Sequence, residues 1–206
     1  MRTGRVLRVA ALGSAALFLL VLGAALRPLL IAESATPAPV LDAVELGFVQ
    51  DMTAHHQQAL ILVERLDPAA DPSVRKMADQ IADVQRVEIG TLLGWTQLAG
   101  AAPTSARPMA WMANSNGHHH DSTAGMPGMA TTADLDALSA ARGADAETLF
   151  LQLMYRHHSG GVTMARAADA LLTSGPVKQA ARAMAQSQSQ EMGYLGMLLD
   201  ARGVRP

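Results

Sequence analysis

Residues 48–56 read FVQDMTAHH, and residues 150–158 repeat this pattern as FLQLMYRHH. Four of the seven histidines lie in these two matched pairs. Each stretch is followed by a second match, in which QRVEI at residues 85–89 corresponds to QSQEM at residues 188–192. We therefore interpret the chain as a duplicated helical hairpin that carries a duplicated set of polar residues.

Composition and spacing together predict an all-α fold. Half of the 206 residues are hydrophobic but only 3% are aromatic, and Ala, Leu and Met abound, which suits close-packed helices better than sheets. One apolar stripe at helical spacing consists of Phe48, Met52, His55, Ala59, Leu62 and Leu66. We predict a four-helix bundle over residues 42–206, with repeat one at about 42–100, one long crossover loop at about 101–132 and repeat two at about 133–203.

Local signals set the expected helix boundaries. Asp67-Pro68 ends the first helix, and Asp71-Pro72 begins the second with a capping residue followed by a proline. Gly100 is a plausible stop for that second helix, and Gly175-Pro176 begins the last one. A short helix at about 133–141 is expected between the crossover and the second hairpin.

The first 31 residues differ in kind from the rest. Three arginines, Arg2, Arg5 and Arg8, precede an uncharged run at residues 9–26. This pattern predicts a cleaved export signal or a single N-terminal membrane anchor over residues 1–31, with a tether at 32–41. Either form places the domain outside the cytoplasm, which predicts a periplasmic or secreted protein, or one on the outer face of the cytoplasmic membrane.

Charge and cysteine content exclude several classes of partner. Without the four arginines of residues 1–31, twelve basic residues face eighteen acidic ones, a net charge of −6, so we expect no binding to nucleic acid. The chain has no cysteine, which excludes disulfides and thiolate metal sites. A protein of this composition that handles a soft metal outside the cytoplasm must use Met and His.

The repeated polar residues lie where the helical pattern requires hydrophobic ones. Glu88 and Glu191 both occupy core positions, and an unpaired buried carboxylate is very costly. A buried His-Glu-Gln hydrogen-bond network is one answer, and a metal ion is the other, since imidazole and carboxylate bind Zn, Cu, Fe and Mn. The duplication of the whole set favours the metal. Candidates for further ligands or supporting residues are Met52, Met154, Met164, Asp51, Gln85 and Gln188.

The crossover loop carries a second group of possible donors. Met126-Pro127-Gly128-Met129 and the histidines His118, His119 and His120 offer thioether and imidazole groups, which suit the capture of Cu(I) or Cu(II). The alternative is an unstructured linker of accidental composition.

These motifs resemble the family called domain of unknown function 305, over about residues 48–203. The family pattern is a repeated Phe-x-x-x-Met-x-x-His-His, each followed by a Gln-x-x-Glu helix, with a Met-Pro-Gly-Met loop between the two halves. The resemblance implies a ferritin-like fold and an exported protein. Some members of the family are associated with copper. It also implies metal ligands at His55, His56, Glu88, His157, His158 and Glu191, with Met126 and Met129 as loop donors. Gly161 departs from the family, which tends to have Ala there, so we expect the half-sites to differ in affinity.

The sequence therefore predicts an extracytoplasmic copper-binding protein that buffers, resists or delivers the ion, with a copper-transfer protein as a possible partner. Zinc, iron and manganese stay open as alternative metals. One rival is a ferritin-like metal-dependent oxidase, for example of Cu(I). Another is a non-metal interaction domain of the envelope. No nucleophile or cofactor loop is recognisable, so an enzyme is the less favoured reading.

Overall fold

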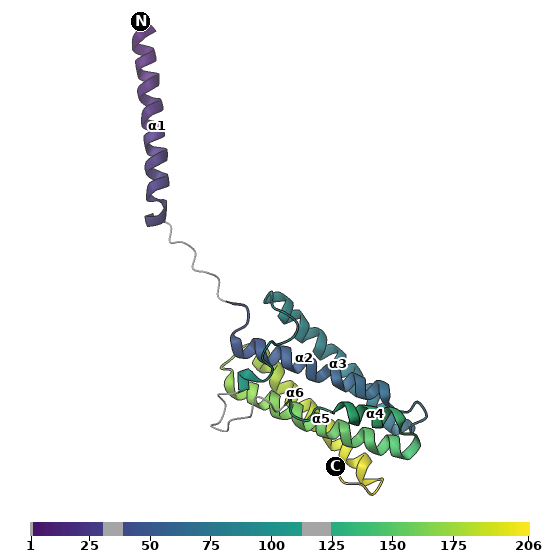
Figure 1. Cartoon of the computed structure of the whole chain (residues 1–206). Helices are drawn as coiled ribbons and strands as arrows, with labels where there is room; N and C mark the ends of the chain where they lie inside the picture. The colour runs from purple at the N-terminus through teal and green to yellow at the C-terminus, as the bar shows by residue number, and fades with distance from the viewer. Residues whose placement is uncertain (1, 31–38, 113–124) are drawn as a thin grey trace. The chain divides into compact units, whose positions relative to one another are not determined.

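The structure is a computed structural model that describes residues 2–30, 39–112 and 125–206. Within these residues it contains α-helices and one short 3-10 helix and no strand, which confirms the expected all-α class. The elements are α1 (Arg2–Leu30), α2 (Ala43–Arg65), α3 (Pro72–Leu98), η1 (Ala110–Met112), α4 (Thr132–Ala140), α5 (Gly143–Leu171) and α6 (Pro176–Asp200). Contacts divide the chain into two units, Met1–Pro39 and Val40–Pro206 (Figure 1).

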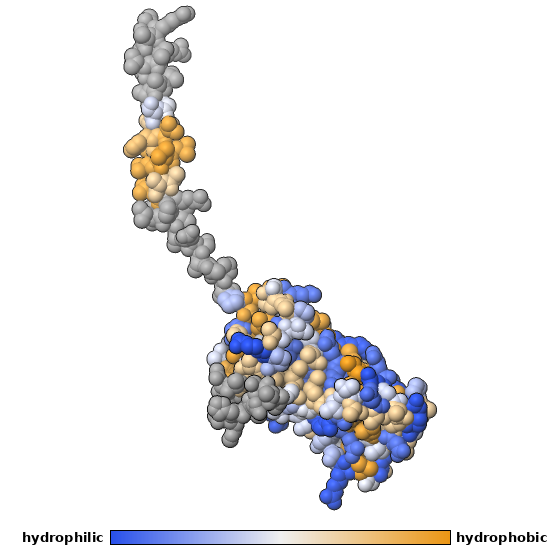
Figure 2. Space-filling view, viewed as in Figure 1, coloured by the Kyte–Doolittle hydropathy of each residue, from blue (hydrophilic) through white to orange (hydrophobic). Residues whose placement is uncertain are grey.

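The first unit consists of α1, a single helix. Its apolar side chains are exposed between residues 12 and 26, and they form a hydrophobic band along the helix (Figure 2). Among the helices in the described part of the chain, none combines the length and the apolar character needed to cross a membrane. The signal or anchor at residues 1–31 stays a prediction.

The second unit is built from two helical hairpins. Asp71-Pro72 and Gly175-Pro176 begin α3 and α6 as expected, and Asp42 begins α2 without having been predicted. Asp42 forms a capping box with Glu45 at the start of α2. Asp71 accepts a hydrogen bond from the backbone N–H of Ser73 at 2.8 Å, with Pro72 at the first turn of α3. Gly175, at φ 104°, takes the left-handed backbone conformation that glycine favours before Pro176 begins α6.

The hairpins α2–α3 and α5–α6 pack against each other mainly through α2 and α5. Their buried apolar side chains form two separate clusters rather than one. The first cluster contains Leu62, Ile81, Phe150 and Leu195 among others. The second is built around Phe48, Leu92, Met164 and Met184. Every long helix of the bundle contributes to both clusters, so the clusters occupy opposite ends of the bundle.

Residues 101–112, the first part of the crossover, are held against α2. Gln50 donates from Nε2 to the carbonyl oxygens of Ala102 at 2.6 Å and Thr104 at 3.3 Å. Asp51 accepts at Oδ2 from the backbone N–H of Met109 at 2.6 Å and from the indole N–H of Trp111 at 2.9 Å. The Trp111 ring meets Phe48 edge-on, with 5.5 Å between ring centroids. This part of the expected loop is therefore attached to the core, and η1 is included in it.

Replacing Asp51 by Ala tests that attachment. The change leaves the buried Trp111 indole and the part-buried Met109 N–H without their acceptor, and a buried unsatisfied donor costs about 1–3 kcal/mol. Urea denaturation should show a loss in this range. The matched control is Asp83→Ala, whose ion pair with Arg86 is exposed and should change stability by less than about 0.5 kcal/mol. Equal stability of the two variants would contradict the proposed attachment.

Candidate metal centre

A layer of buried polar side chains separates the two apolar clusters. Each long helix contributes two residues to it, between its residues of one cluster and those of the other. The layer consists of His55 and His56 from α2, Gln85 and Glu88 from α3, His157 and His158 from α5, and Gln188 and Glu191 from α6. All four histidines have 0% exposure. The structure thus brings together the two histidine pairs and the Gln and Glu residues that follow them in each repeat.

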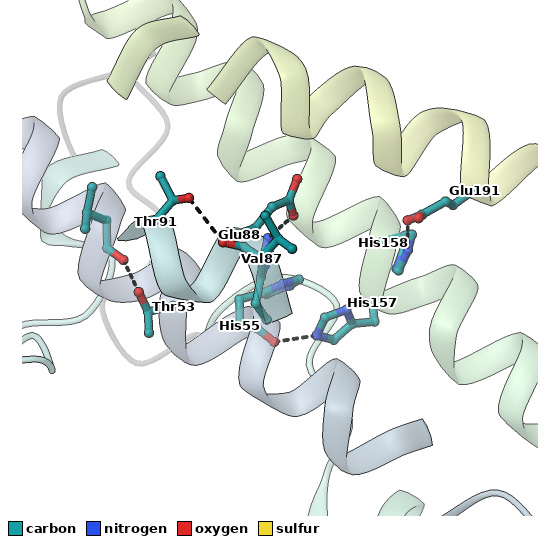
Figure 3. A network of polar contacts seen from close by, with 10 residues as sticks. Thr53, His55, Val87, Glu88, Thr91, His157, His158 and Glu191 are labelled. Carbon is teal, nitrogen blue, oxygen red and sulfur yellow. Dashed lines mark hydrogen bonds and ion pairs between the residues drawn. The ribbon is translucent and has the colours of Figure 1, made fainter. Parts of the chain in front are cut away.

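Within each hairpin, one histidine pairs with the glutamate of the neighbouring helix (Figure 3). Nε2 of His56 lies 2.7 Å from Oε2 of Glu88, and Nε2 of His158 lies 2.7 Å from Oε2 of Glu191. The two pairs differ in access, because the Glu88 side chain is 17% exposed and the Glu191 side chain is 7% exposed. An ionised carboxylate only accepts hydrogen bonds, so it orients each ring by accepting from Nε2–H.

The other two histidines form an inner pair between the hairpins. The rings of His55 and His157 lie 3.9 Å apart between centroids, tilted by 33°. Nε2 of His157 donates to the backbone carbonyl of His55 at 2.9 Å, a contact drawn in Figure 3. Nε2 of His55 donates to the backbone carbonyl of Pro127, a residue of the crossover, at 3.0 Å. Because a carbonyl oxygen has no hydrogen to give, both Nε2 atoms carry the proton.

One nitrogen of every ring is left over. The Nδ1 atoms of His55, His56, His157 and His158 are all buried without a hydrogen-bond partner. The side-chain oxygen and nitrogen of Gln85 and Gln188 are buried and unpaired as well. A neutral imidazole with hydrogen on Nε2 has its lone pair on Nδ1, which is the form that binds a metal ion. Among the described residues, each ring thus has one nitrogen held by the protein and one buried nitrogen without a partner.

Burial keeps the inner pair in this neutral form. It lowers the pKa of His55 to about 3, with a further lowering by the charge of His56 and a smaller opposing effect of the bond to Pro127. Burial likewise lowers the pKa of His157 well below its usual value, and the neighbouring His55 and His158 add to the effect. Near neutral pH the two inner rings are therefore uncharged, with a hydrogen on Nε2 and a lone pair on Nδ1.

The remaining predicted residues take other places. Asp51 holds Met109 and Trp111, as described above. Met52 and Met164 are fully buried in the second apolar cluster and Met154 in the first. Met126 and Met129 are half-buried in the last part of the crossover. His118, His119 and His120 lie outside the described residues. No group of three or more imidazole or carboxylate side chains in the described ranges is arranged to enclose a metal ion.

Two contacts of the site involve residues that the sequence does not single out. The Pro127 carbonyl accepts from His55, and Gln58 binds the neighbouring Ala130 through both its amide atoms. Pro127 looks like a turn residue, and its carbonyl becomes part of the site only through the packing of the crossover on α2. The one available signal was the Gly160-Gly161 pair inside a predicted helix, since adjacent helical glycines indicate close approach of another segment.

Comparison with known proteins places this arrangement among related folds. A family model described as Domain of unknown function (DUF305) matches residues 45–199. No curated protein shows a significant match to the chain. A DUF305 protein from Streptomyces coelicolor, described as secreted, is 37% identical with a TM-score of 0.70, over 79% of this chain and 94% of that one. A DUF305 fragment from Deinococcus radiodurans is 29% identical with a TM-score of 0.63, over 78% and 97%.

A third similar structure contains a metal. CopM in its Cu(II)-bound form is 26% identical to this chain, with a TM-score of 0.55 over 75% of this chain and 94% of that one. CopM has also been solved with Cu(I) and with Ag, at identities of 24% and 21%, and these two matches show the shared fold.

Stability should depend on pH because of the inner pair. Unfolding returns His55 and His157 to an ordinary pKa near 6.5, so the unfolded state binds protons that the folded state excludes. The metal-free protein should therefore lose stability as pH falls from about 7 to 5, by up to about 1.4 kcal/mol per pH unit for each histidine. The carboxyls of Asp67, Asp71, Asp134 and Asp169, whose pKa values are lowered, add their own loss only at lower pH. Urea denaturation at each pH measures the effect, and a constant free energy of unfolding from pH 7 to 5 would contradict it.

Proposed function

This chain belongs to the DUF305 family, and on that premise we propose that it is an extracytoplasmic copper-binding protein. The proposal is carried by one observation, the four buried Nδ1 atoms that have no hydrogen-bond partner. A purely structural His-Glu-Gln network would leave these atoms and both glutamine amides unsatisfied, at about 1–3 kcal/mol for each buried group. A metal ion that accepts the Nδ1 lone pairs would remove the share of that cost that comes from the four histidines.

The donor set fits copper. Imidazole nitrogen is a good ligand for Cu(I) and Cu(II), and Cu(I) can be bound with a low coordination number. The inner pair offers two neutral rings whose centroids are 3.9 Å apart. The half-buried Met126 and Met129 supply thioethers, which favour Cu(I), and we propose them as donors that deliver the ion. Met52 and Met154, one helical turn before the histidines, are the nearest thioethers along the helices.

The glutamates have a supporting role in this proposal. Each accepts from the Nε2–H of an outer histidine, which fixes the ring and increases the electron density at Nδ1. Their two negative charges in the buried layer also offset the charge of a bound cation. We therefore propose His55, His56, His157 and His158 as the ligands that contact the ion, and Glu88 and Glu191 as the residues that orient and balance them.

The similar proteins support this proposal. CopM, 26% identical to this chain, was solved with bound Cu(II), and the Streptomyces coelicolor relative is described as secreted. We propose that residues 1–31 direct or anchor this chain in the same way, that 32–41 form a tether and that 42–206 form the copper-binding bundle. Buffering the ion or passing it to a partner protein then requires no catalytic group beyond this site.

The first test removes the inner pair. Purified without an affinity tag, the wild-type protein should compete with a Cu(I) chelator, and its melting temperature should rise with the ion. At a free ion concentration of 100 times Kd, binding stabilises the native state by about 2.7 kcal/mol. His55→Ala together with His157→Ala should abolish the tight site and the rise. Met126→Leu together with Met129→Leu should keep the rise in melting temperature. These two changes should weaken only the initial capture of the ion by the loop. A wild-type protein whose melting temperature ignores Cu(I) would refute the metal proposal and favour the structural network.

A second test examines the supporting carboxylates. Glu88→Gln and Glu191→Gln keep the side-chain shape but remove the negative charge that accepts from His56 and His158. Loss of such a supporting group lowers metal affinity by about 10–100-fold, so chelator competition should show this drop in each variant. Glu64→Gln is the matched control, because Glu64 is exposed on α2 and away from the layer. Affinities equal to the control would show that the glutamates take no part in the site.

A further inference from the structure

The two hairpins differ where the crossover passes over them. Pairing residues by the repeat, with His55 opposite His157, places Gln58 opposite Gly160 and Ala59 opposite Gly161. Gln58 binds Ala130 through two hydrogen bonds, donating from Nε2 to its carbonyl at 2.9 Å and accepting at Oε1 from its N–H at 2.6 Å. The first hairpin therefore grips the segment 126–130 with a side chain, and the second hairpin has a glycine at the corresponding position.

That glycine marks the closest approach of the segment to α5. A Cβ at Gly160 would lie 1.9 Å from the carbonyl oxygen of Pro127 and 2.8 Å from the nitrogen of Gly128. The fit is reciprocal, since a Cβ at Gly128 would lie 2.4 Å from the carbonyl oxygen of Arg156, and Gly128 has φ 77°. Two glycines thus let the backbones of the segment and α5 meet.

The position of the Pro127 carbonyl decides which nitrogen of His55 carries the lone pair. The Pro127 carbonyl accepts from Nε2–H of His55 at 3.0 Å, so the hydrogen stays on Nε2 and the lone pair on Nδ1. Among the described residues, Pro127 supplies the acceptor of the His55 Nε2–H, so displacing its carbonyl allows the hydrogen to move to Nδ1. The ring would then present a donor where a metal ion requires a lone pair.

We propose that Gly160 and Gln58 are positioning residues that seat the Pro127 carbonyl on His55 and thereby fix the ring in the tautomer that can bind a metal ion. The crossover is on this account a working part of the inner site as well as a carrier of methionines. The consequence for metal affinity rests on the proposed function, whereas the choice of tautomer belongs to the metal-free protein and does not.

The experiment compares glycine variants of the full chain. Gly160→Ala places a methyl group against Pro127. Gly161→Ala is the neighbouring control, because its Cβ meets the flexible amide of Gln188 instead, and Gly193→Ala is the open control, with no atom within 4 Å. In the metal-free proteins labelled with 15N, long-range 1H–15N correlation of the imidazoles reports the tautomer of each buried histidine. Competition with a Cu(I) chelator reports affinity on the same samples.

In the wild type and both controls, we expect His55 with hydrogen on Nε2. In Gly160→Ala we expect it to shift partly or fully to Nδ1, with a loss of Cu(I) affinity of about 10–100-fold, the usual effect of losing a supporting contact. Hydrogen on Nδ1 in the wild type, or an unchanged tautomer in folded Gly160→Ala, overturns the proposal. Should Gly160→Ala not fold, Gln58→Leu loosens the same segment without added backbone crowding and must show the same shift. A tautomer shift in a protein that never binds Cu(I) upholds the positioning role and refutes the proposed function.

Discussion

The layer of buried polar side chains between two apolar clusters is the constraint on which the rest of the bundle depends. A continuous hydrophobic core would be the simpler way to pack four helices, because each polar group taken from water must find a partner or raise the energy of the fold. Here all four long helices give up their central core positions to histidine, glutamine or glutamate. Helix register, the meeting of α2 with α5 and the course of the crossover all have to agree with this one layer.

Much of this was predictable from the sequence. Asp71-Pro72 begins α3 because capping is local chemistry that a few adjacent residues determine. The burial of Glu191, His55 and His157 followed from their place in an apolar stripe, whereas the full burial of His56 and His158, outside the stripes, did not. The roles within the site were not predictable in the same way. Glu88 and Glu191 are predicted from the sequence either as metal ligands or as members of a His-Glu-Gln network. Their pairing with His56 and His158 is set by how neighbouring helices face each other.

The two hairpins are duplicated, but the single crossover makes them inequivalent. Two hairpins can be related by symmetry, but a single crossover passes over the bundle once and contacts each hairpin differently. Asp51 and Gln58 hold it on the first hairpin, where the second has Leu153 and Gly160 at the corresponding positions. The inner pair repeats this inequality, since His157 donates to the backbone of the first hairpin and His55 to the crossover. The His-His motif is repeated, whereas its backbone support is not.

The separation of the contacts along the chain has a consequence for folding. Each outer pair joins residues only 32 or 33 positions apart and can form as soon as its own hairpin closes. The inner pair joins residues 102 positions apart, and the bond to Pro127 spans 72. Contacts of such long range form late, because the intervening chain must first lose its freedom. A folding chain would thus form its two His-Glu pairs before the inner pair, and the complete polar layer would signal that both hairpins and the crossover have docked.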